Sequence, residues 1–172
     1  MTNSFSRYRP YMWGGFAALI ALPAVAMMFS TGVNWGPEDF IFATLLFGVL
    51  GGGIELAMRA RQVASYRWAG ALALGMGFVT LWVNMAVGII GNDDNPLNAH
   101  YLWVLGIPIV GSIAARFKPT GMALAMIATA IAHLAIAGVA HAAGYNIWPF
   151  AMVFGFGHGV AAYLYRSAAS KG

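Results

Sequence analysis

The sequence contains no cysteine and very little charge. Without cysteine there is no disulfide framework, no zinc–thiolate site and no thiol chemistry. Only 8% of the 172 residues are Asp, Glu, Lys or Arg, whereas a soluble domain carries roughly 25%. So few charges cannot cover a water-facing surface, and 60% of the residues are hydrophobic. The composition therefore indicates a membrane protein.

The sequence contains six long apolar runs. Each run is close to the roughly 20 residues that a helix needs to cross a hydrocarbon core about 30 Å thick. They cover about 11–30, 39–58, 68–91, 100–116, 121–143 and 147–166. This pattern predicts an all-α fold, a polytopic transmembrane bundle of six helices that forms one integral membrane domain over residues 1–172.

The connections between these runs should alternate between the two sides of the membrane, and the few charges are separated by sign between the two sets of connections. Four acidic residues fall in the connections predicted on one side, namely Glu38, Asp39, Asp93 and Asp94. All nine cations fall on the other side: Arg7, Arg9, Arg59, Arg61, Arg67, Arg116, Lys118, Arg166 and Lys171. Cytoplasmic loops are enriched in Lys and Arg, so both termini are predicted to be cytoplasmic (N-in/C-in). The basic residues are then topology signals, the expected partner is the lipid bilayer, and nucleic acid is not expected.

The first apolar run has some features of a signal peptide. Arg7 and Arg9 precede it, and a small-residue site, AVA, lies at 24–26. The run continues through MMF at 27–29, which is long for a signal peptide. We expect an uncleaved first helix. Cleavage would leave five helices and an outer N-terminus.

The three outer connections share one spacing. They read GVNWGP at 32–37, GNDDNP at 91–96 and GYNIWP at 144–149. Glycine can end one helix in a left-handed conformation, and proline suits the first turn of the next. The favoured interpretation is that each connection uses this helix grammar, in which glycine ends one helix and proline begins the next. Three copies of one helical hairpin are the alternative, since membrane transporters use internal repeats.

Two histidines lie deep inside the last two segments. His133 is twelve residues before the turn near residue 145, and His158 is thirteen after it. At about 1.5 Å per residue both lie roughly 18–20 Å from that turn, so an antiparallel hairpin gives them the same depth. Such a pair can ligate a haem b iron or a metal ion, relay protons, or only support packing. His133 and His158 are the candidate cofactor-binding residues.

His141 and His100 form a candidate second pair nearer the outer surface. His141 follows His133 by eight residues and so lies on a similar helix face. Histidine pairs at two depths are similar to the arrangement of two-haem membrane cytochromes, although the spacing matches no signature of them.

Other polar residues lie within or beside the apolar segments. Glu55 precedes Arg59 by four residues, which favours a helix-surface ion pair, with a proton-carrying carboxylate as the alternative. Asn84 lies inside the third segment and should face other helices. It leads into an outer cluster with Asp93 and Asp94. An anchored, solvated loop is the favoured interpretation of that cluster, and a site for a hard cation such as calcium is the alternative.

The same region carries a resemblance. The pattern W-x-N-x-A-V-G-I-I-G, followed by N-D-D-N-P-x-N, resembles a group of small multi-pass bacterial inner-membrane proteins with no established activity. The resemblance covers about residues 35–120 and implies a location in the bacterial inner membrane. It implies no catalytic residue.

Enzyme motifs are missing from the chain. There is no P-loop, HExxH or GxSxG, and no lysine lies mid-segment to form a retinal Schiff base. We expect a small inner-membrane protein, non-enzymatic, with an accessory or a solute- or proton-handling role, in a homo-oligomer or a membrane complex. The alternative is a redox subunit in which His133 and His158 hold haem or a metal.

Overall fold

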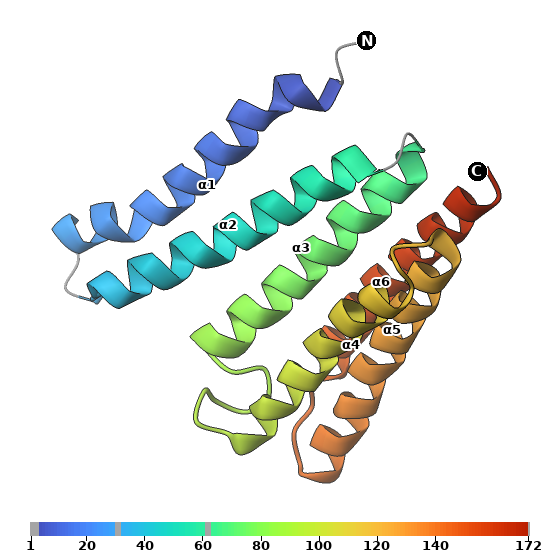
Figure 1. Cartoon of the computed structure of the whole chain (residues 1–172). Helices are drawn as coiled ribbons and strands as arrows, with labels where there is room; N and C mark the ends of the chain where they lie inside the picture. The colour runs from blue at the N-terminus through green and yellow to red at the C-terminus, as the bar shows by residue number, and fades with distance from the viewer. Residues whose placement is uncertain (1–3, 30–31, 61–62, 172) are drawn as a thin grey trace. The chain divides into compact units, whose positions relative to one another are not determined.

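The structure is a computed structural model that describes residues 4–29, 32–60 and 63–171, and within these ranges its regular structure is all helical (Figure 1). The helices are α1 Ser4–Phe29, α2 Pro37–Ala60, α3 Ala64–Ala86, the 3₁₀ helix η1 Pro96–Ala99, α4 His100–Ala114, α5 Pro119–Ala142 and α6 Trp148–Ala169. The all-α prediction with six α-helices is therefore confirmed. Residue 30 of the first predicted segment and Arg61 lie outside the described residues.

Five helical segments in these ranges are long and apolar enough to cross a membrane. They are Arg7–Phe29, Pro37–Arg59, Ala64–Ala86, Pro96–Ala114 and Pro119–Ala142. α6 is not among them, although it has 22 residues. Its tryptophan, proline, histidine, glycines and tyrosines lower its mean hydropathy. The predicted segment 147–166 is thus helical, but it is less hydrophobic than the other five segments.

The third predicted segment, 68–91, is wrong at its outer end. α3 ends at Ala86, although the apolar letters continue through Ile90. Gly88 and Gly91 have φ of 71° and 73°, in the left-handed region that stops a helix. The chain therefore turns back, and Ile90 is buried beneath the outer loop.

The outer connections follow the predicted helix grammar at several positions. Besides Gly91, Gly144 has a positive φ, of 88°. Pro37 begins α2, Pro96 begins η1, and Pro149 lies in the first turn of α6. The repeat interpretation stays a prediction.

The chain divides into two compact units, Met1–Leu56 and Ala57–Gly172. In the first unit, Phe16 of α1 packs on Phe47 of α2 with ring centroids 5.1 Å apart. The Trp13 ring lies over Gly51, where an added Cβ would come within 2.7 Å of it. Glycine at this position therefore lets the indole lie against the α2 backbone.

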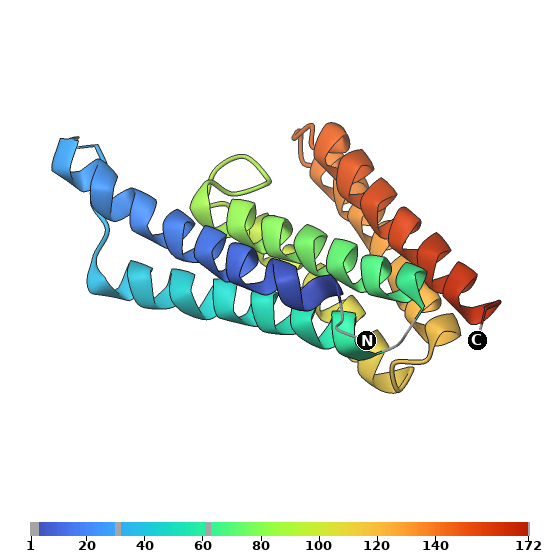
Figure 2. The ribbon, with the colours of Figure 1, turned by 90° about the horizontal axis from the view of Figure 1, so that it is seen from above.

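In the second unit, α5 and α6 lie side by side, with α4 against α5 and α3 against α6 (Figures 1 and 2). Two clusters of buried apolar residues form its core. The Tyr165 cluster contains Tyr66, Ala69, Met122, Ala123, Ala125, Met126, Ala161, Ala162, Tyr165 and Ala168. The Tyr101 cluster contains Ile90, Tyr101, Val104, Ala137, Ala140, Ile147 and Ala151. Along α5 and α6, the candidate histidines fall between the two clusters.

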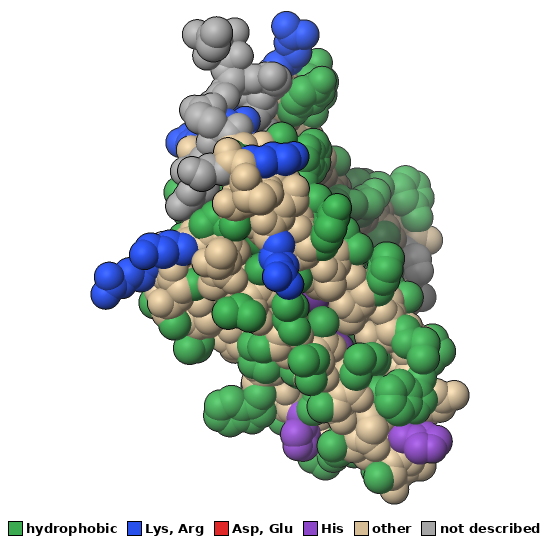
Figure 3. Space-filling model, turned by 90° about the vertical axis from the view of Figure 1, so that its right-hand side faces the viewer, with side chains coloured by type: hydrophobic (Ala, Val, Ile, Leu, Met, Phe, Trp, Pro, Cys, Tyr) green, Lys and Arg blue, Asp and Glu red, His purple; other side chains and the backbone are tan. Residues whose placement is uncertain are grey.

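Large apolar side chains are exposed on the second unit, among them Trp103, Phe156 and Tyr163. Figure 3 shows a face on which hydrophobic side chains are widespread. Soluble monomers rarely expose large continuous apolar patches. Together with the five span-capable segments, this surface is that of a membrane protein.

Candidate functional site

His133 of α5 and His158 of α6 lie in contact inside the second unit. Their ring centroids are 5.2 Å apart and the ring planes are inclined by 30°, a stacked arrangement. Both are fully buried, with 0% and 1% of their surface exposed. The short connection between the helices explains the contact, because Tyr145 N–H donates to the Ala140 carbonyl and folds the chain back at once. His133 and His158 lie at nearly equal distances along the chain from this turn, and they therefore come into contact.

His158 finds a hydrogen-bond partner on its own helix. Its Nδ1 lies 2.8 Å from the Phe154 carbonyl oxygen, one turn earlier. A carbonyl only accepts, so Nδ1 carries the proton and donates, and Nε2 of the neutral ring keeps its lone pair. Two buried threonines nearby make the same local bond: Thr129 donates to Ala125, and Thr80 of α3 donates to Met76.

His133 does not make such a bond. Both ring nitrogens are buried, and neither has a hydrogen-bond partner among the described residues. Aromatic rings surround it: Tyr101 and Phe154 at 5.9 Å, and Phe150 at 6.3 Å, between ring centroids. Leaving a buried polar group unsatisfied costs about 1–3 kcal/mol. An imidazole kept here at that cost is a candidate for function.

Tyr101 belongs to the same constellation, and the sequence analysis missed it. It lies in the first turn of α4, with 0% of its surface exposed, and packs edge-on against Phe150 at 5.8 Å. Its hydroxyl also has no hydrogen-bond partner among the described residues. A tyrosine at the start of an apolar helix is typical of the membrane interface. No signal in the sequence distinguished this buried one from an interfacial one.

Axial haem ligation by the histidine pair stays a prediction. The lone pair of an imidazole nitrogen lies in the ring plane, so two axial ligands point edge-on at an iron between them. Here the ring centroids are 5.2 Å apart and the ring planes are inclined by 30°. Among the described residues, no three His, Asp or Glu side chains gather into a metal-binding group.

The other histidines lie apart from this pair. His100, at the start of α4, is exposed, and its Nδ1 donates to the Leu97 carbonyl at 3.0 Å. His141, in the last turn of α5, is also exposed. The structure describes no ring contact between them, so they do not form a second stacked pair.

The outer polar cluster is organised around Asn98. This buried side chain accepts from the N–H groups of Ile89 and Ile90 and donates to the carbonyls of Ile90 and Asn92. Asp93 and Asp94 are exposed at the tip of the loop. The geometry is that of an anchored loop with solvated acids.

Asn84 lies one turn of α3 below that loop. It is half-buried, and its side-chain oxygen has no hydrogen-bond partner among the described residues. No contact joins it to the histidine pair.

Glu55 belongs to the first unit. Its carboxylate accepts from the Arg9 guanidinium and from Trp13 Nε1 at 2.8 Å, so two side chains of α1 are bonded to α2. These two partners come from the preceding helix, and the pairing with Arg59 expected from the sequence stays a prediction.

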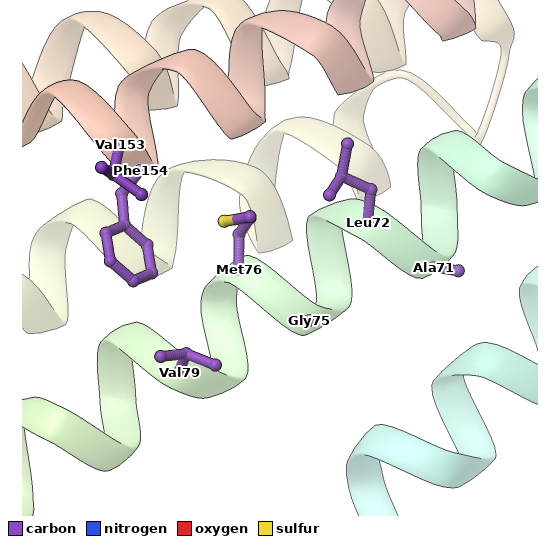
Figure 4. A pocket seen from close by; sticks show the side chains of 7 residues that line it. All are labelled: Ala71, Leu72, Gly75, Met76, Val79, Val153 and Phe154. Carbon is purple, nitrogen blue, oxygen red and sulfur yellow. The ribbon is translucent and has the colours of Figure 1, made fainter. Parts of the chain in front are cut away.

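An apolar groove of about 320 Å³ lies between α3 and α6 (Figure 4). It is lined by Ala71, Leu72, Gly75, Met76, Val79, Val153 and Phe154. The groove holds neither histidine, but Phe154 lines it and also packs on His133. None of the side chains that line the groove carries a nitrogen or oxygen atom.

Comparison of the chain with family models, with curated proteins and with solved structures finds no match.

Proposed function

We propose that this chain is an integral membrane protein of the bacterial inner membrane that handles protons, with His133 and His158 as the groups that take up and release them. One observation carries the proposal: a fully buried imidazole with both nitrogens unpartnered, stacked on a second buried imidazole. Ionisable groups at membrane depth are costly and are functional candidates for that reason. Histidine suits the role because it changes charge near neutral pH.

The proposal includes a membrane-crossing α6, an N-in/C-in topology and an inner-membrane location. α6 is covered by α3 and α5 along much of its length, so it needs less lipid-facing hydropathy than a helix on the periphery. The sign distribution of the charges supports the topology. The resemblance over residues 35–120 supports the location.

Proton flux in liposomes tests the function. The purified protein is reconstituted around a pH-sensitive dye, and a potassium gradient with valinomycin drives proton entry. We expect a flux above that of empty liposomes, and its loss in His133→Gln and in His158→Gln. His141→Gln is the matched control, because it places the same substitution on α5 at an exposed position. A wild-type flux equal to that of empty liposomes contradicts proton translocation.

Topology is tested separately, and the absence of native cysteine removes any labelling background. Single cysteines replace Asp94 and Lys171, and intact cells are treated with a membrane-impermeant maleimide. We expect labelling at position 94 only. Labelling of both positions would contradict the odd number of crossings, by α4, α5 and α6, that the proposal places between them.

A further inference from the structure

We infer that Tyr101 and His133 together bind a water molecule between α4 and α5, which makes Tyr101 the third member of the histidine site. The inference deepens the proposed function and rests on it for the role of the site.

The unpartnered atoms belong to two adjoining side chains. The Tyr101 hydroxyl and both ring nitrogens of His133 are buried and unpartnered among the described residues. The two rings belong to neighbouring helices, with centroids 5.9 Å apart and planes inclined by 49°. No hydrogen bond joins them directly. Three unsatisfied polar atoms on adjoining side chains are the setting in which buried water is found.

The surroundings offer these atoms no other partner. Phe150 and Phe154, which pack on His133, have no polar side-chain atom. Other buried polar side chains at this level, Thr80, Thr129 and His158, are already bonded to carbonyls of their own helices. Of the side chains that pack on His133, Tyr101 is the one whose buried polar atom makes no hydrogen bond with the described residues.

The chemistry of the two side chains fits water. A neutral imidazole has one donor and one acceptor nitrogen, and a phenol hydroxyl donates and accepts. Water donates two hydrogen bonds and accepts two, so one molecule can bond to both side chains. A permanently charged ligand fits poorly, because this apolar enclosure holds no opposite charge.

The position of Tyr101 gives the water a consequence. Tyr101 belongs to the apolar cluster that includes Ile90, directly beneath the outer loop. A hydrated link would join His133, in the middle of α5, to a residue in the first turn of α4. Tyr101 acts here as a positioning residue, because it holds the water that contacts His133.

Solid-state NMR of the full chain in lipid bilayers tests the inference. The four histidines are labelled with ¹⁵N in the ring, and the His133 signals are assigned by their loss in His133→Gln. We expect transfer from water protons to a His133 ring nitrogen. Tyr101→Phe removes only the hydroxyl and should abolish this transfer. His141, which is exposed, gives the water signal that proves the experiment works.

Phe150→Leu is the matched control for packing. Phe150 contacts both Tyr101 and His133 without a polar side-chain atom, so this variant should keep the transfer. Three results would overturn the inference: no water transfer to His133 in the wild type, transfer unchanged in Tyr101→Phe, or equal loss in Phe150→Leu. Proton flux without water transfer refutes only the bound water. Water transfer without flux refutes only the proposed function.

Discussion

Two buried polar side chains of the second unit have opposite surroundings. Asn98 is 5% exposed and makes four hydrogen bonds that hold the outer loop in place. His133 is 0% exposed and makes none with the described residues. The difference separates two uses of polarity in an apolar protein. A polar group that builds the fold is satisfied by it, whereas one kept unsatisfied is available to something that binds.

Asn98→Ala should have the largest effect on stability, because it leaves the N–H groups of Ile89 and Ile90 without an acceptor. We expect the free energy of unfolding to fall by about 2–4 kcal/mol. It is measured by denaturation in mixed micelles. Asn92→Ala changes an exposed side chain of the same loop and should stay within about 0.5 kcal/mol. Equal losses of stability in the two variants would show that the Asn98 side chain does not hold the loop in place.

Gly88→Ala tests the backbone that Asn98 holds. The residue has φ of 71°, and an added Cβ would lie 2.3 Å from the Asn92 carbonyl oxygen. A left-handed alanine costs about 1–2 kcal/mol before any clash is relieved. Gly75→Ala is the control, since no atom lies within 4 Å in the helix interior, and it should gain about 0.5–1 kcal/mol. Thermal unfolding should move in opposite directions for the two variants.

Arg9→Ala tests an intermediate case, in which the buried carboxylate of Glu55 is bonded to an exposed partner, Arg9. Glu55 would keep only Trp13 of its two recorded partners on α1. Because the Arg9 side chain is 48% exposed, we expect a loss of about 1 kcal/mol, well below that of a fully buried pair. The unfolding midpoint measures it. Arg7→Ala, two residues away and exposed, should have no effect, and an equal shift would mean that general charge is responsible.

His133→Leu should have the smallest effect on stability and the largest on function. It replaces an unsatisfied ring by an apolar group of similar size, which is close to neutral or stabilises by up to about 1 kcal/mol. His158→Leu removes a real hydrogen bond to Phe154 and should cost about 1 kcal/mol. Both variants should lose proton flux. A greater loss of stability in His133→Leu than in His158→Leu would show that His133 is a structural residue after all.

Some of these features were predictable from sequence and some were not. The contact between His133 and His158 was predictable, because the two residues lie at nearly equal distances along the chain from one short turn. The end of α3 was missed because Val87–Ile90 keeps the apolar pattern, while the helix stops through the left-handed glycines and the Asn98 side chain. Tyr101 was missed because its burial depends on α5 and α6, far along the chain. The unsatisfied state of His133 depends on side-chain orientation, which no spacing encodes.

The close packing of α6 on α5 has a consequence for biogenesis. Gly155 lies so near α5 that an added Cβ would be 3.4 Å from the Ala130 carbonyl oxygen. α5 is the most hydrophobic of the five span-capable segments in the described ranges, and α6 is not one of these segments. We expect the insertion machinery to accept α5 on its own and α6 only as its hairpin partner. For this C-terminal pair, entry into the bilayer and tertiary folding then become one event during synthesis.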